Sequence, residues 1–404
     1  MLVVHKYGGS SVATTEKIWE IAKYLKNLHQ NGDDLVVVVS AMGKTTNNLI
    51  TLANNLSNFP NKREMDVLMS TGEMQSVALM SIALNELGVK AVSMSGAQAG
   101  FITNNNHMHA YIEELDVTKI KDYINRRYVV IVAGFQGVTK DQETTTFGRG
   151  GSDTTATALA AKLGCNCEIY TDVDAVCSVD PNLFGEAKKL HLLTYDEMME
   201  MAVAGAKVLE PRSVELAKKY HVPLYLGKTL NSDKSKGTWV MDKVNVEEMG
   251  INSLSVRDDF YVVLFRFSTD ESEYQSKIFE AINGLINFEM LQQAKVFGEY
   301  IISFGCSKTI FDEIKSRIEQ SFMEDFEVLE NCKRVSVIKD LCRITLVGVG
   351  LSTHTQIASD VFNLLLKNGI EYSFVANTEI SISFAISQED KQRTIDVLTK
   401  SLNL

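Results

Sequence analysis

The chain has 404 residues and a formal net charge of -11, with six cysteines and no apolar run that we expect to span a membrane. This length exceeds what one compact core accommodates, so two or three domains are expected. The acidic balance argues against nucleic-acid or anionic-membrane partners, and cysteines without paired C-x-x-C spacing favour a reduced, cytoplasmic protein.

The N-terminal residues Met1–Ala13 form an apolar run that ends in a lysine and a glycine-rich turn, and a helical pattern follows from Thr14. Gly8 and Gly9 would let backbone N–H groups approach an anion closely, and the following helix N-terminus would add positive potential. The spacing is neither that of a P-loop nor that of a dinucleotide fingerprint, so the turn indicates a phosphate site without naming the ligand.

From residue 1 to about residue 250, apolar runs alternate with amphipathic helices, which predicts a three-layer α/β domain with a mostly parallel sheet. Continuous apolar runs such as Leu35–Val39 are typical of buried parallel strands. Further strands are expected at Val129–Ala133, Glu168–Tyr170 and Leu224–Leu226, and helices at Glu16–His29, Ser76–Leu87 and Asp153–Leu163. The polar segment 228–252 is expected to lead out of this domain.

The remainder of the chain repeats one order of elements, which is strand, helix, strand, strand, helix. An Asn-Gly pair follows the first helix of each unit, at Asn283-Gly284 and at Asn368-Gly369. This duplication of a βαββαβ unit predicts two ferredoxin-like domains, at 251–335 and 336–404, which can interlock.

The stretch 148–153 is a glycine-rich loop directly before a helix, which Ser152 or Asp153 can cap. Its free N–H groups and Arg149 would make an anion cradle, because an arginine fork fits a carboxylate. A plain loop with a helix cap is the alternative. Thr171 and Asp172 follow a strand, where ligands of α/β sheets bind or where aspartates simply form a turn.

Two histidines, His107 and His109, look like a metal pair, but no third ligand has suitable spacing. We therefore expect a loop with two solvated histidines. Lys207 lies in a stretch of small residues and, taken by itself, is a surface charge.

Seven motifs in one order carry a resemblance that covers essentially the whole chain. They are Lys6–Val12, Val39–Gly43, Ser70–Glu73, Gly134–Gly137, Arg149–Asp153, Thr171–Pro181 and Gly205–Pro211. With them the chain resembles monofunctional aspartate kinases of the amino-acid kinase superfamily, and its duplicated C-terminal unit resembles their paired ACT domains. The fold this implies is an amino-acid kinase domain at 1–250, followed by ACT regulatory domains at 251–335 and 336–404.

The resemblance implies ATP-dependent phosphorylation of the β-carboxylate of L-aspartate to 4-phospho-L-aspartate, the first step of the lysine, threonine and methionine branch. A carboxylate nucleophile is already ionised at pH 7, so catalysis reduces to positioning and charge neutralisation. The implied catalytic residues are Lys6, Asp153 and Lys207, with Asp153 accepting from both lysines. Mg²⁺ is expected on the ATP phosphates, without metal ligands from the protein.

The resemblance also implies where substrate and nucleotide bind. Arg149 would hold the α-carboxylate of aspartate and Glu73 its α-ammonium, with Thr45 and Ser152 beside them. The implied ATP-binding residues are Lys6, Gly8, Gly9, Ser10, Ser40, Thr171, Asp172, Val176 and Lys207. Cys177 and Asn182 stand where the family commonly has a tyrosine and an arginine, which removes two common nucleotide contacts.

The ACT resemblance implies feedback inhibition by an amino acid, with L-lysine as the leading candidate and L-threonine as a further one. We expect the inhibitor between the repeats of partner chains, in a homodimer or homotetramer assembled through these domains. The expected contacts are Asp270, Glu289, Gln293, Gln356, Ile357, Asn377 and Thr378, because acidic side chains suit an ε-ammonium group. The alternative is that Glu289 and Gln293 are ordinary exposed sheet residues.

Two other functions stay open. A kinase for acetylglutamate, glutamate or a nucleoside monophosphate is opposed by the Glu73 and Arg149 pair and by the duplicated C-terminal unit. A non-catalytic amino-acid sensor is opposed by Lys6 and Asp153, whereas Cys177 favours it.

Overall fold

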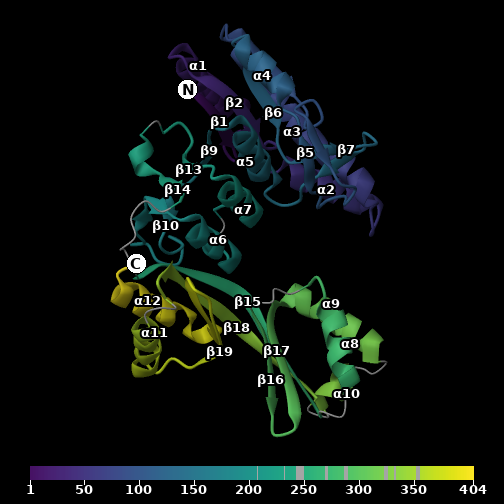
Figure 1. The fold of residues 1–404 in the computed structure, drawn as a ribbon, viewed down its shortest axis with the longest axis vertical. Helices are drawn as coiled ribbons and strands as arrows, with labels where there is room; N and C mark the ends of the chain where they lie inside the picture. The colour runs from purple at the N-terminus through teal and green to yellow at the C-terminus, as the bar shows by residue number, and fades with distance from the viewer. Residues whose placement is uncertain are drawn as a thin grey trace. The chain divides into compact units, whose positions relative to one another are not determined.

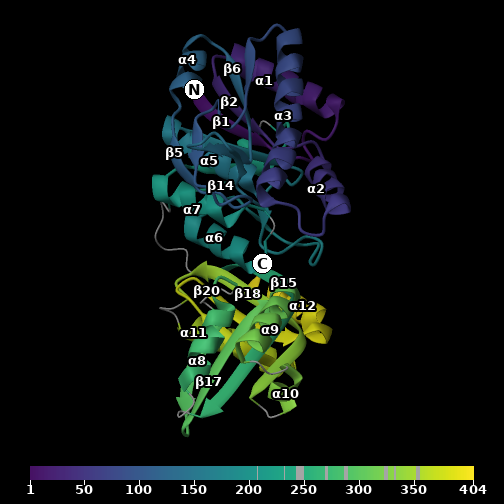
Figure 2. The same ribbon diagram turned by 90° about the vertical axis from the view of Figure 1, so that its right-hand side faces the viewer.

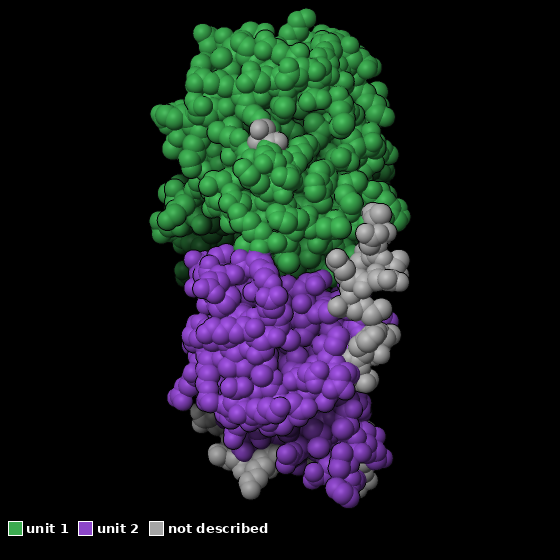
Figure 3. Space-filling view, turned by 90° about the vertical axis from the view of Figure 1, so that its left-hand side faces the viewer, with its two compact units in different colours: residues 1–177, 189–203, 207–246 green, residues 178–188, 204–206, 247–404 purple. Residues whose placement is uncertain are grey.

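The computed structural model describes residues 1–206, 208–231, 233–242, 250–268, 272–285, 290–322, 326–331, 334–351 and 355–404. The chain divides into two compact units, coloured separately in Figure 3. Unit 1 comprises residues 1–177, 189–203 and 207–246, and unit 2 comprises residues 178–188, 204–206 and 247–404. The sequence analysis placed segments 178–188 and 204–206 in the first domain, whereas here they cluster with unit 2.

Unit 1 contains two main sheets. The larger sheet has β1 (Leu2–Tyr7), β2 (Asp34–Val39), β3 (Ala91–Met94), β6 (Val129–Ala133), β9 (Asn166–Thr171), β12 (Leu192–Leu193), β13 (Leu224–Lys228) and β14 (Thr238–Val240). Their order is β12-β14-β13-β9-β1-β2-β6-β3, and every neighbouring pair is parallel except β13 and β14. The smaller sheet has β4 (Phe101–Thr103), β5 (Ile112–Leu115), β7 (Gln136–Thr139) and β8 (Thr144–Thr146), and β10 (Val176–Cys177) pairs separately with β11 (Lys189–Leu190).

Helices cover both faces of the larger sheet (Figure 1). The helices in this part of the chain are α1 (Thr15–Gln30), α2 (Thr45–Leu56), α3 (Lys62–Glu86), α4 (Thr118–Asn125), α5 (Gly151–Leu163), α6 (Tyr195–Ala204) and α7 (Pro211–Tyr220). Alternate residues of a strand point to opposite faces. Tyr7 accordingly packs in one core with Ile21 of α1 and Val77 of α3, whereas Lys6 pairs with Asp153 of α5. The predicted three-layer α/β domain is confirmed.

Several predicted boundaries change in the structure. Helix α3 begins at Lys62 rather than at Ser76, and β14 pairs with β13 inside the segment expected to be a linker. Helix α5 begins at Gly151, its N-cap is Gly150 in a left-handed conformation, and no side chain caps it. The predicted cap by Ser152 or Asp153 is therefore wrong, because both residues already lie in the first turn.

Contrary to the sequence-based expectation, α3 is long and apolar enough to cross a membrane by length and composition alone. However, 56% of its most apolar window is buried, and Val77 and Met80 pack in the core against the sheet. The core helix of a globular unit passes the same test, so α3 is weak evidence for a membrane.

Unit 2 is built on one antiparallel sheet (Figure 2). Its elements are β15 (Gly250–Ser268), α8 (Ser272–Ile282), β16 (Leu291–Val296), β17 (Glu299–Ser307), α9 (Lys308–Phe322), α10 (Phe326–Asn331), β18 (Val335–Val349), α11 (Thr355–Lys367), β19 (Tyr372–Asn377), β20 (Ser381–Ser387) and α12 (Lys391–Leu402). The strand order is β16-β17-β15-β18-β20-β19.

The two repeats share their long strands. The first half of β15 pairs with the second half of β18, and residues 260–265 of β15 pair with residues 335–341 of β18. The register shifts where these halves meet, next to Asp259 and Asp340, which both have positive φ. Each repeat thus completes its four strands with half a strand from the other repeat.

Each repeat has its own apolar core. Helices α8 and α9 cover β15 and β17 through residues such as Ile278 and Ile314, and α11 and α12 cover β18 and β20 through residues such as Val361 and Ile395. Val179 of segment 178–188 is buried in the second core, and its neighbour Ser178 accepts a backbone hydrogen bond from Leu254 at 2.7 Å.

Candidate active site

A buried ion pair lies at the carboxyl end of the parallel sheet. Lys6 is the penultimate residue of β1, between β2 and β9, and Asp153 lies in the first turn of α5. Their Nζ and Oδ1 atoms are 2.5 Å apart, with only about a tenth of each side chain exposed. A cation held there, where ligands of open α/β sheets bind, can meet an anionic group without rearranging.

The glycine-rich turn follows directly after β1. Gly8 donates to the Tyr170 carbonyl of β9, which ties the turn to the neighbouring strand. A Cβ on Gly9 would stand 2.8 Å from the Ala41 carbonyl oxygen, so only glycine fits against the loop after β2. Ser40 begins that loop and donates its N–H to the Tyr7 carbonyl. The sheet therefore brings Lys6, Gly8, Gly9 and Ser40 together, and their contact with ATP stays a prediction.

Glu73 is a buried carboxylate with one partner. It lies on α3 with 3% of its surface exposed, and its Oε1 accepts from the Ala41 N–H at 3.1 Å. Its Oε2 is buried without a hydrogen-bond partner among the described residues. Burial raises the pKa of Glu73 to about 7, although the Ala41 N–H opposes this rise. A ligand that offers an N–H donor would satisfy the remaining oxygen.

The other predicted substrate residues surround the same strand ends. Thr45 begins α2 beside Gly72, the residue before Glu73 on α3. Ser152 packs so closely against Gly134 after β6 that a Cβ there would stand 2.6 Å from its Oγ. Arg149 is exposed, and its neighbours Gly148 and Gly150 both have positive φ.

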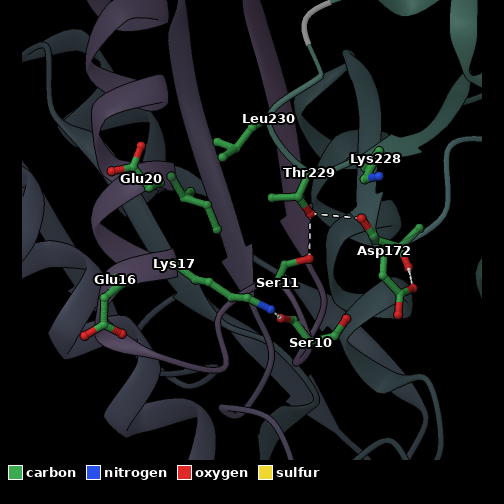
Figure 4. A pocket seen from close by; sticks show the side chains of 11 residues that line it. Ser10, Ser11, Glu16, Lys17, Glu20, Asp172, Lys228, Thr229 and Leu230 are labelled. Carbon is green, nitrogen blue, oxygen red and sulfur yellow. Dashed lines mark hydrogen bonds between the residues drawn. The ribbon is translucent and has the colours of Figure 1, made fainter.

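A cavity of about 350 Å³ opens at the ends of β9 and β13 (Figure 4). Ser10, Thr171 and Asp172, three of the predicted ATP-binding residues, line it. Lys17 and Lys228 line it too, and Lys17 donates to the Ser10 carbonyl at 2.9 Å. The sequence analysis missed both lysines, because a lysine on an amphipathic helix or at a strand end usually faces solvent.

One predicted nucleotide residue lies away from this cavity. Val176 is buried in β10, where its N–H donates to Thr238 Oγ1 at 2.8 Å. Lys207 lies outside the described residues. Its role in binding phosphate therefore stays a prediction.

Comparisons with known proteins identify the family of this chain. The model of the amino acid kinase family matches residues 1–228, and an ACT domain model matches residues 344–402. Across its whole length the chain is 38% identical to the aspartokinase of Geobacillus stearothermophilus and 36% identical to aspartokinase 2 of Bacillus subtilis, covering 97% and 98% of those proteins. The chain belongs to the aspartokinase family. It is thus an aspartate kinase, a phosphotransferase with a carboxyl acceptor, and carries an ACT regulatory domain.

Solved structures extend this comparison to the fold. A structure of E. coli aspartokinase III in complex with aspartate and ADP matches with a TM-score of 0.80 over 100% of both chains, at 22% identity. The same protein in complex with lysine and aspartate matches with a TM-score of 0.73 over 99% of both chains, also at 22% identity. At this identity the likeness shows the common aspartokinase fold of both units.

The predicted inhibitor residues lie in unit 2 or outside the described residues. Asp270 and Glu289 are in the latter group. Gln293 on β16 and Asn377 at the end of β19 are exposed. Gln356 is exposed, and donates to Asp360 at 2.8 Å. Of the other two, Ile357 packs against the second core and Thr378 bonds to Ser381 across a turn.

A second buried network supports β1 and β9 on the α1 face. Burial opposes ionisation of Glu168, but hydrogen bonds from His5, Lys234 and Tyr170 outweigh it and lower the pKa of Glu168 to about 2. His5 and Glu168 neighbour Lys6 and Ile169 in the sheet, so this network fixes the strands that carry the site.

The predicted solvated histidine loop is wrong for His107. Its Nδ1 lies 2.8 Å from Oδ2 of Asp66, a fully buried residue of α3, and only 16% of the His107 side chain is exposed. The sequence analysis missed Asp66. Its spacing from Ser70 and Glu73, which places all three on one helix face, was the available signal.

No group of three His, Cys, Asp or Glu side chains in the described part of the chain is arranged to hold a metal ion.

Proposed function

We propose that this kinase transfers the γ-phosphoryl group of ATP to the β-carboxylate of L-aspartate and forms 4-phospho-L-aspartate. The observation that carries the proposal is the buried pair of Lys6 and Asp153, next to the same strand-end loops that contact Glu73. Lys6 offers a fixed positive charge for phosphoryl transfer, and the half-satisfied Glu73 offers an acceptor for an ammonium group.

Phosphoryl transfer in this site needs charge neutralisation more than proton transfer. The attacking β-carboxylate is ionised at pH 7, so no residue has to remove a proton. Lys6 would contact the transferred phosphoryl oxygens, and Asp153 would hold the Lys6 ammonium in place. Lys207 would contact the same phosphates and share Asp153. The backbone N–H groups of the turn at Gly9 and Ser10 would hold the β- and γ-phosphates.

The amino acid would be recognised by both of its charges. Glu73 would accept from the α-ammonium, which supplies the partner that its Oε2 lacks. Arg149 would bind the α-carboxylate in a bidentate manner, and the flanking glycines give its backbone the required freedom. Thr45 and Ser152 would add hydrogen bonds from the first turns of α2 and α5.

The nucleotide would lie across the ends of β1, β9 and β13. Ser10, Thr171 and Asp172 line one cavity there, and Lys17 and Lys228 make its rim partly basic. Mg²⁺ bound to the ATP phosphates would supply further charge neutralisation, because this cation usually keeps few protein ligands. Val176 does not line this cavity, so its contact with the nucleotide stays a prediction.

We further propose feedback inhibition by L-lysine at the ACT repeats, with L-threonine as a second effector, in a cytoplasmic homodimer or homotetramer. The reaction would be the first step of the lysine, threonine and methionine branch. The lysine in the E. coli aspartokinase III structure supports this choice of effector. The exposed Gln293, Gln356 and Asn377 leave polar groups available to a ligand or to a partner chain. Inhibitor binding would bias closure of the kinase site, which must exclude water.

The test is turnover of ATP coupled to formation of aspartyl hydroxamate, with and without L-lysine and L-threonine. Aspartate-dependent turnover that L-lysine suppresses is the expected result. Turnover that neither amino acid suppresses would overturn the choice of effector alone. Absence of turnover with aspartate in folded protein would overturn the proposed reaction.

A further inference from the structure

We propose that Asp66 is a positioning residue for the amino-acid substrate, because it anchors residues 107–109 against Gly148 and thereby fixes the backbone that carries Arg149. This inference rests on the proposed roles of Arg149 and Glu73 as the two ends of the substrate clamp. Asp66 itself would contact no ligand and would act through the loop that carries Arg149.

Asp66 is fully buried and accepts from three residues of two segments. Its Oδ1 accepts from the Thr146 hydroxyl at 2.5 Å and from the Met108 N–H at 3.0 Å, and its Oδ2 lies 2.8 Å from His107 Nδ1. Thr146 ends β8, two residues before Gly148. One carboxylate on α3 therefore holds both the start of the Arg149 loop and the loop that packs on it.

The two loops touch where Arg149 begins. A Cβ on Gly148 would stand 2.8 Å from His109 Nδ1 and 2.9 Å from the Met108 carbonyl oxygen, so the two backbones are in close contact. Met108 itself has a φ of 70°, which costs free energy unless its surroundings hold it. The bond from the Met108 N–H to Asp66 is one such restraint. Arg212 adds a bond to the Ala110 carbonyl at 2.9 Å.

The same helix face carries Glu73. Asp66 and Glu73 lie two turns apart on α3, a rise of about 10 Å, and both point into unit 1. Between them, the Ser70 carbonyl accepts from the buried Gln136 of β7 at 3.0 Å. The ammonium and carboxylate of an amino acid are attached to one carbon, so their two receptors must keep a fixed spacing. A rigid helix that holds Glu73 directly and Arg149 through Asp66 provides that spacing.

A purely structural role would have a different signature. Loss of general stability lowers the active fraction and alters the kinetics with both substrates alike. Loss of positioning raises KM for aspartate alone, and this effect disappears in a variant that lacks Arg149. The comparison of KM for aspartate with KM for ATP therefore separates the two roles.

The experiment measures initial rates of the full chain with both substrates varied, for the wild type, Thr146→Val and Asp66→Asn. Thr146→Val removes one donor to Asp66 and keeps the side-chain volume, so it carries the test even if Asp66→Asn fails to fold. Thr71→Val makes the same change on the exposed face of α3, where the hydroxyl donates to the Leu68 carbonyl of its own helix. It is the matched control.

We expect Thr146→Val and Asp66→Asn to raise KM for aspartate on the order of tenfold, with KM for ATP unchanged within about twofold. In an Arg149→Ala background, Thr146→Val should change KM for aspartate by less than about twofold, because the residue that it positions is gone. The proposal is overturned if KM for aspartate does not change, if both KM values rise together, or if the tenfold effect persists without Arg149. A wild-type chain without aspartate-dependent turnover would instead overturn the proposed function, and with it this inference.

Discussion

The two units bury different kinds of residues where their ligands are expected. At the strand ends of unit 1, Lys6, Glu73 and Asp153 are nearly inaccessible to solvent. In unit 2, three of the polar residues expected to bind the inhibitor, Gln293, Gln356 and Asn377, are exposed beside apolar cores. Burying charge costs free energy and is useful where charge develops during a reaction. The proposed regulatory site, to which we expect a second chain to contribute, does not need charges buried in advance.

The largest effect should follow from removing the fixed cation. Lys6→Ala deletes the positive charge that we propose contacts the transferred phosphoryl group, and it removes the lysine that pairs with Asp153 in the described part of the chain. We expect kcat to fall by about 10²–10³-fold, measured as aspartyl hydroxamate formation at saturating substrates. The control is Lys23→Ala, at a half-exposed lysine of α1 whose ion-pair partner among the described residues is Glu20. A Lys6→Ala variant that keeps kcat within about tenfold of the wild type would contradict the proposal that buried charge in unit 1 serves the reaction.

Glu168 tests whether buried charge in unit 1 also supports the strands. Its pKa in the folded chain is lowered to about 2, so ionised Glu168 contributes stability that is fully present above the ordinary glutamate pKa of 4.5. That contribution is lost as the pH falls from 4.5 towards 2. Glu168→Gln should lower the free energy of unfolding by about 3 kcal/mol at pH 7, measured by urea unfolding.

The difference in free energy of unfolding between Glu168→Gln and the wild type should shrink as the pH falls below 4.5. Glu20→Gln, at an exposed glutamate of α1, is the control and should change stability by less than about 0.5 kcal/mol. An equal loss in both variants would show that the Glu168 network adds nothing beyond a surface charge.

Substitution of Glu73 should change affinity for aspartate and folding stability in opposite directions. Burial raises its pKa to about 7, so the folded chain holds a proton between pH 4.5 and 7 that the unfolded chain has lost. Stability without ligand should therefore fall as the pH rises through this window. An ionised Glu73 binds an ammonium group better, so KM for aspartate should fall between pH 6 and pH 8.

Glu73→Gln should raise KM for aspartate by about tenfold or more and remove this pH dependence, while the unfolding temperature at pH 8 rises. Glu64→Gln, at an exposed position of the same helix, should leave all three quantities unchanged. A pH dependence of KM that survives Glu73→Gln would assign the titration to another group.

The smallest effects are expected in unit 2. Asn377→Ala and Gln356→Ala remove exposed side chains, so stability should change by less than about 0.5 kcal/mol. We expect both to raise the L-lysine concentration for half-inhibition several-fold, with kcat unchanged. Asn363→Ala, on the exposed face of α11, is the control. If all three variants keep the same inhibition curve, the proposed inhibitor site is misplaced.

Local sequence was sufficient for most elements of unit 1 and for the residues at its strand ends. Apolar runs such as Leu35–Val39 predicted β2 to within one residue, and the glycine turn after Lys6 lies where the pattern placed it. Both depend on neighbours in the chain, because strand burial and turn geometry are set over a few residues.

Other features depended on residues far apart in the chain. Packing between distant segments decides whether Asp66 is buried and whether His107 contacts it. Such packing also decides which half of β15 pairs with which half of β18. The sequence by itself determined the α/β class, the repeat and the strand-end loops, because local propensity and periodicity record them. Only the tertiary structure decided the carboxylate partners and the shared strands, because a helical or strand pattern states which face is buried but not which residue it meets there.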